Sequence, residues 1–79
     1  MMKEDEIKEQ LMSSSADFRR LAEEHHRKER QLQELRSHPH LSEQDHVAEM
    51  TLKKKKLQLK GQMNSMVLKF RNELSHQPT

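Results

Sequence analysis

The sequence predicts an all-α protein: an antiparallel, coiled-coil-like hairpin of two amphipathic helices, preceded by a short N-terminal helical segment. Apolar residues in the first half recur at alternating spacings of four and three, the heptad pattern of a helix that packs on another helix. Pro39 interrupts this pattern, and the next proline is Pro78. Only 30% of the residues are hydrophobic and 35% are charged. That composition is typical of coiled coils or of disordered chains, and the periodicity favours the coiled coil.

The first half of the chain is expected to form two helical segments, over residues 3–12 and 16–36. Ser15 is predicted to cap the second of these, because a serine hydroxyl can accept a free N–H group of the first turn. Six of the nine seam positions are large and apolar, the nine being Ile7, Leu11, Ser14, Phe18, Leu21, His25, Lys28, Leu32 and Leu35.

A turn over residues 37–42 is expected to follow, because proline cannot continue a helix and disfavours helical geometry in the residue before it. Ser42 is a good N-cap, and Asp45 three residues later can complete a shortened capping box. The second long helix is predicted over residues 43–74, about 48 Å at 1.5 Å per residue. With a tail over residues 75–79, the 79 residues are expected to form one domain.

The second long helix has two apolar faces, since Leu57 and Leu59 cannot point the same way on a helix. We expect one face to pack on the first long helix, with Leu35 beside Val47 and His25 beside Leu57. The predicted hairpin core is Phe18, Leu21, His25, Leu32, Leu35, Val47, Met50, Leu57 and Gly61. The predicted interaction face is Leu52, Leu59, Met63, Met66, Phe70 and Leu74. Because one chain cannot cover both faces, we expect a homo-oligomer, assembled as a helical bundle, or a complex with another protein.

Charge is unevenly placed along the chain. Residues 1–35 hold seven Lys/Arg and nine Asp/Glu, whereas residues 36–79 hold eight and four. The basic cluster Lys53, Lys54, Lys55, Lys56 and Lys60 could contact nucleic-acid phosphates. Four consecutive residues surround a helix, however, and no aromatic residue accompanies them to stack on bases. We therefore favour solvated lysines that pair with acidic residues of the first long helix, namely Glu23, Glu24, Glu29 and Glu34.

The remaining motifs give no catalytic, cofactor or metal site. His38, His40 and His46 could converge on a metal ion, but no fixed ligand motif supports this. There is no glycine-rich phosphate loop, and a two-helix chain offers no concave pocket, so we do not expect an enzyme. No apolar run is long enough to span a bilayer, and no secretion signal is present, so we expect a cytoplasmic protein. A basic amphipathic helix could also lie on an anionic membrane surface.

Two motifs resemble the YdcH-like family of small bacterial proteins of unknown function. The first is the spacing of Phe18, Leu21 and His25, and the second is the lysine-rich stretch from Met50 to Lys60. The resemblance covers about residues 7–70 and implies a helical architecture and a bacterial cytoplasmic setting. It supplies no catalytic residue. We therefore expect a non-catalytic interaction or scaffolding module, with weak nucleic-acid binding as the alternative.

Overall fold

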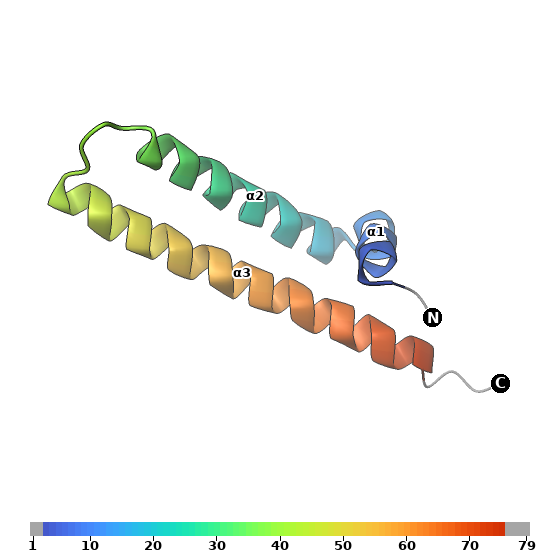
Figure 1. Ribbon diagram of the computed structural model, residues 1–79. Helices are drawn as coiled ribbons and strands as arrows, with labels where there is room; N and C mark the ends of the chain where they lie inside the picture. The colour runs from blue at the N-terminus through green and yellow to red at the C-terminus, as the bar shows by residue number, and fades with distance from the viewer. Residues whose placement is uncertain (1–2, 76–79) are drawn as a thin grey trace.

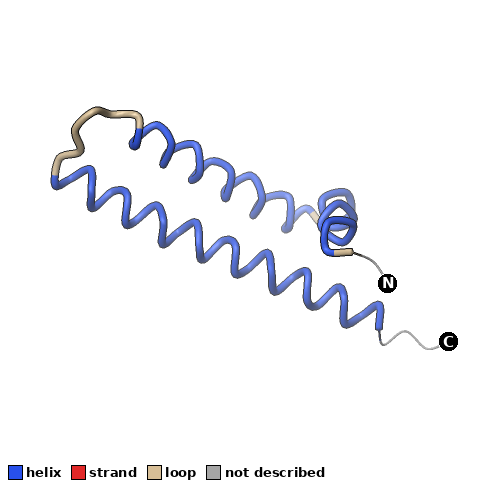
Figure 2. The backbone as a smooth tube through the Cα atoms, viewed as in Figure 1, coloured by secondary structure: helices blue, strands red, loops and turns tan. Residues whose placement is uncertain are grey.

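The computed structural model describes residues 3–75, and these form three α-helices without any strand. They are α1 (Glu4–Ser14), α2 (Ala16–Arg36) and α3 (Glu43–Ser75). Helices α2 and α3 lie side by side and run in opposite directions, and α1 crosses the end where α2 begins (Figure 1). Within residues 3–75, loops form the α2–α3 connection and short stretches before α1 and α2 (Figure 2). The all-helical prediction is confirmed, and α1 ends two residues beyond its expected end at residue 12.

Serine caps fix where α2 and α3 begin. The Ser15 hydroxyl accepts the Phe18 backbone N–H at 3.1 Å. At the start of α3, the Asp45 N–H donates to the Ser42 hydroxyl and the Ser42 N–H donates to the Asp45 carboxylate, both at 3.1 Å. These bonds hold the pKa of Asp45 below its ordinary value. Both predicted caps are confirmed. They could be predicted because each depends only on residues within three positions of one another.

The main core lies where all three helices meet. Ile7, Leu11, Phe18 and Val67 form one buried cluster, and Phe18 and Ile7 are each only 1% exposed. Leu32 is buried separately, further along α2 toward the turn. Leu21, His25 and Leu35 are half-buried on the same helix. The α2 residues assigned to the hairpin core from the sequence therefore all lie on the side that faces α3.

The structure contradicts the predicted use of the two faces of α3. Val47, Met50 and Leu57, assigned to the hairpin core, are 63%, 70% and 68% exposed. Gly61, assigned to the same core, is exposed, and a Cβ atom added there would have no neighbour within 4 Å.

The residues predicted to form an outward interaction face instead line the inside of the molecule. Met63, Met66 and Phe70 pack against the buried cluster, and Leu52 and Leu59 are half-buried. Leu74, at the end of the same row, is 38% exposed.

The physical reason for this reversal is the apolar content of the two faces. The inward row presents leucine, methionine and phenylalanine, whereas the other row is interrupted by Lys54, Gly61 and Asn64. Since the hydrophobic effect grows with apolar area removed from water, the richer row is the one that packs. The α2–α3 pairing is accordingly shifted by nearly one helical turn from the predicted register, so that Glu29 meets Lys56 and Arg36 meets Glu49.

Candidate interaction surface

The side of α3 that faces away from α2 carries four exposed apolar side chains in one row. They are Val47, Met50, Leu57 and Leu68, which are 55% to 70% exposed; we call them the outer stripe. Their separations of three, seven and eleven residues keep them on one line of the helix, about 32 Å long. The alignment of these side chains on one face, rather than their exposure alone, makes the outer stripe a candidate contact surface, since singly scattered apolar residues are normal on protein surfaces.

Gly61 lies within the outer stripe, between Leu57 and Leu68. It is exposed, and the space where its side chain would project is empty. A glycine in mid-helix costs roughly 1 kcal/mol relative to alanine. Among the described residues, no packing contact at Gly61 requires the absence of a side chain, so the outer surface of α3 is open at this position.

The lysines considered for nucleic-acid contact do not form one patch. Lys53 pairs with Glu49 on its own helix at 3.6 Å, and Lys56 turns inward to pair with Glu29 of α2. Lys54, Lys55 and Lys60 are exposed and make no ion pair with the described residues. Of the expected pairs between these lysines and the acids of α2, the structure shows the one between Lys56 and Glu29.

The charges between α2 and α3 hold the two helices to each other. The Arg36 guanidinium donates to the Glu49 carboxylate at 3.3 Å, and this bond lowers the pKa of Glu49. The hydrogen bond from Lys56 likewise lowers the pKa of Glu29. Burial, followed by the charge of Lys56, lowers the pKa of His25. The Arg36–Glu49 and Lys56–Glu29 ion pairs therefore both join α2 to α3.

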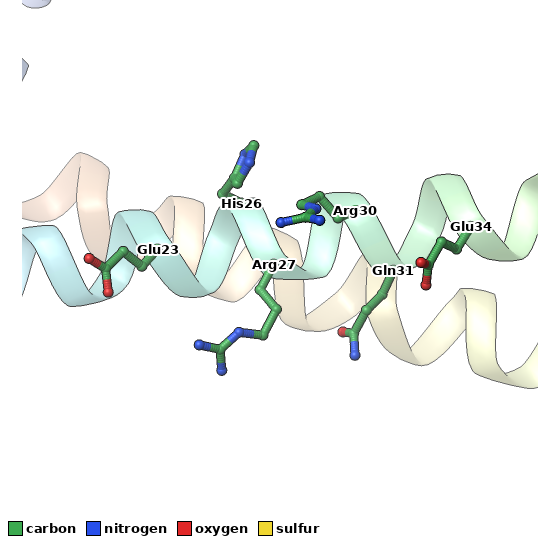
Figure 3. Close-up of a pocket in the computed structure, with 6 residues that line it drawn as sticks. All are labelled: Glu23, His26, Arg27, Arg30, Gln31 and Glu34. Carbon is green, nitrogen blue, oxygen red and sulfur yellow. The ribbon is translucent and has the colours of Figure 1, made fainter.

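A shallow hollow lies on the outside of α2. It is lined by Glu23, His26, Arg27, Arg30, Gln31 and Glu34. All six belong to one helix, and their side chains point in different directions (Figure 3). Arg27 is bonded to Glu24 at 2.8 Å, and no hydrogen bond within the described residues joins any two of the six. Among the described residues, the hollow therefore shows no hydrogen-bonded pair of acid–base or nucleophilic groups in its lining.

The histidines of the turn region are not assembled into a metal site. Among residues 3–75, no three His, Asp or Glu side chains are grouped closely enough to hold a metal ion. His38, His40 and His46 are all exposed. Separately, none of the described helices is both long enough and apolar enough to cross a membrane.

Sequence reasoning missed several residues of the α2–α3 seam, including Val67 and the paired charges. Glu49, Lys56 and Val67 were not assigned to the core, although Val67 is 3% exposed. For Glu49 and Lys56, the available signal was the spacing of residues 49, 52, 56, 59, 63, 66 and 70, which alternates three and four without a break. Val67 is not a member of that series. The two charged members of that series obscured the pattern.

Comparison with known proteins identifies one family. Residues 18–67 match the family described as "Protein of unknown function (DUF465)". The matched segment includes most of α2, the turn and most of α3, and it agrees with the resemblance to the YdcH-like family. No curated protein and no solved structure matches the chain.

Proposed function

We propose that this chain, which belongs to the DUF465 family of unknown function, is a non-catalytic interaction module that binds through the outer stripe of α3. The observation that carries the proposal is the line of four large apolar side chains left 55% to 70% exposed on a helix whose other face is already packed. An apolar row of this kind is typical of a helix that packs against a second helix.

The apolar side chains of the outer stripe can supply only a limited binding free energy. Burying one partly exposed aliphatic side chain contributes on the order of 1–2 kcal/mol. Association costs roughly 4–15 kcal/mol in lost translational and rotational freedom. Four side chains therefore support a weak complex, and tight binding needs further contacts from the residues that flank the stripe.

This proposal relocates the association surface expected from the sequence. An oligomer built through Leu59, Met63, Met66 and Phe70 would need residues that now pack against α1 and α2. Self-association and binding of a different protein both remain within the proposal, and both would use the outer stripe.

Nucleic-acid binding is a second candidate, favoured by Lys54, Lys55 and Lys60, which are exposed and form no ion pair within the part of the chain that the structure describes. Only two aromatic residues are present, Phe18 and Phe70, and both pack in the core, so neither can stack on a base. Any such binding should rest on phosphate contacts and weaken steeply with salt. A gel-shift series from low to physiological salt would measure it.

Site-specific photo-cross-linking tests the proposed function. A photoreactive phenylalanine analogue would replace Leu57 in one variant and Arg30, exposed on the outside of α2, in a matched control. Each would be irradiated as purified protein and in extract of the native host. Adducts with a second copy or another polypeptide are expected from position 57, and excess unlabelled wild type should compete them away. Equal labelling at the two positions, or none at position 57, would contradict the proposal.

A further inference from the structure

The outer stripe lies in a stretch of α3 whose own sequence is strongly basic. Between residues 50 and 72 the sequence has seven basic residues and no acidic one: Lys53, Lys54, Lys55, Lys56, Lys60, Lys69 and Arg71. Lys54 and Lys60 lie three residues before and after Leu57, which places them on either side of it along the helix. Both are exposed, and neither pairs with a carboxylate among the described residues.

A second copy of the chain complements this surface poorly. In a parallel pairing of two outer stripes, Lys54 of one copy would face Lys54 of the other. In an antiparallel pairing centred on Leu57, Lys54 would face Lys60. Either orientation places like charges opposite one another at the middle of the contact, where no acidic residue of α3 is available to offset them.

A lipid surface also fits less well than a protein helix. Helices that lie on membranes present a broad apolar face, usually with aromatic residues. The outer stripe is narrow, Lys54 and Gly61 interrupt it, and it contains no aromatic residue. Its separations of three, seven and eleven residues instead match the seam between two packed helices.

We infer that the outer stripe is the docking site for an acidic amphipathic helix of another protein. The partner's apolar residues, at heptad spacing, would cover Val47, Met50, Leu57 and Leu68. Its Asp or Glu residues would flank that seam and pair with Lys54 and Lys60, and Gly61 would leave room for close approach of the partner helix. The inference rests on the proposed function and specifies which partner chemistry the site accepts.

A designed peptide serves as the probe. It consists of four heptads with leucine at the two seam positions and glutamate at the two flanking positions, and it carries a fluorescent label for anisotropy measurements. One control peptide has lysine in place of glutamate, and another keeps glutamate but has serine in place of leucine. The full-length protein is expected to bind the first peptide at concentrations below about 0.1 mM, to bind neither control, and to lose affinity as salt is raised.

Variants of the protein then locate the contact. Lys54→Glu and Lys60→Glu should each weaken binding about tenfold, as should Leu57→Asn, the scale typical of a central interface residue. Arg30→Glu makes the same charge change at an exposed position on α2 and should leave binding unaltered. Circular dichroism of every variant verifies that helix content is retained.

The possible failures are distinguishable. No binding of the glutamate peptide, or equal weakening by Arg30→Glu and Lys54→Glu, would overturn the inference. If the protein instead self-associates and Leu57→Asn abolishes that association, the proposed function stands and the inference falls. Binding to phosphatidylglycerol-containing vesicles without binding to the peptide would replace the protein partner with a membrane. If position 57 cross-links to no polypeptide and no probe binds, both fail.

Discussion

Replacing Leu59 with alanine should destabilise the protein much more than the same replacement at Leu57. Both leucines occupy the interior of α3, so the change in intrinsic helix propensity is equal for the two variants. Leu59 lies in the half-buried row that faces α2, whereas Leu57 is 68% exposed in the outer stripe. The pair therefore isolates the contribution of packing.

The expected magnitudes follow from burial. Leu→Ala at a fully buried site costs about 2–5 kcal/mol in the free energy of unfolding. Because Leu59 is half-buried, about half of that range, roughly 1–2.5 kcal/mol, is expected. At Leu57 the change should stay within about 0.5 kcal/mol, the usual range for surface substitutions.

Urea titration followed by circular dichroism at 222 nm, the helix signal, measures both values, provided that the denaturant slopes agree. Repeating the titrations at several protein concentrations separates folding of one chain from association. Equal losses at the two positions would refute the assignment of faces. A larger loss at Leu57 that grows with protein concentration would show instead that a second copy covers the outer stripe.

Three other changes have defined outcomes. Gly61→Ala should raise the free energy of unfolding by up to about 1 kcal/mol in thermal or urea melts, because the added methyl group meets no neighbour; a loss would contradict its open position. Ser15→Ala removes the cap on α2 and should lower the free energy of unfolding by about 1 kcal/mol. Ser13→Ala should lower it much less, because the Ser13 hydroxyl donates to the Glu9 and Gln10 carbonyls of its own helix and caps no N–H group. The free energy of unfolding should fall as pH drops below about 6.5, the ordinary pKa of histidine. Because the pKa of His25 is lowered in the folded protein, the unfolded chain binds a proton at a pH where folded His25 is still neutral. A second fall is expected below the ordinary glutamate pKa of 4.5, as Glu29, whose folded pKa is lowered, becomes protonated. Urea titrations across pH at constant ionic strength test both steps, and a wild-type profile that stays flat below pH 6.5, or a His25→Gln variant that keeps the first fall, would contradict the account.

The parts of the fold that depend on neighbouring residues could be predicted from the sequence. The starts of α2 and α3 follow from Ser15 and Ser42, whose hydroxyls each bond to an N–H three residues away. The inward side of α2 follows from a heptad series in which Phe18 and Leu32 are both large and apolar. The capping bonds lie within one helical turn, and the heptad series can be read along α2 itself.

The packing face of α3 could not be chosen in the same way. Leu57 and Leu59 belong to two rows with similar spacing, and the choice between them depends on the register against α2 and on where α1 lies. Ile7 and Leu11 reach Val67 across more than fifty residues of sequence, and no local pattern encodes that contact. Lys56 occupies a seam position of α3 where the pattern alone predicts an apolar residue, and its partner Glu29 lies outside the heptad series of α2.

The candidate surface changed for the same reason. The sequence shows two apolar rows on α3, but the row predicted to pack is exposed and the row predicted to be exposed is packed. Once Met63, Met66 and Phe70 pack in the core, the exposed row holds four apolar residues rather than six. Lys54 and Lys60, which form no ion pair within residues 3–75, lie beside it. The proposed association surface therefore moves from the inward row to the outer stripe.

Methionine oxidation of the wild-type protein tests the two-faced assignment of α3 most directly, because no substitution is needed. Hydrogen peroxide oxidises exposed thioethers faster than packed ones, and peptide mass spectrometry resolves each site. Met50, which is 70% exposed, should react nearly as fast as in the urea-unfolded chain. Met63 and Met66, packed against the core, should react several-fold more slowly. Protection of Met50 together with rapid oxidation of Met63 and Met66 would contradict the account.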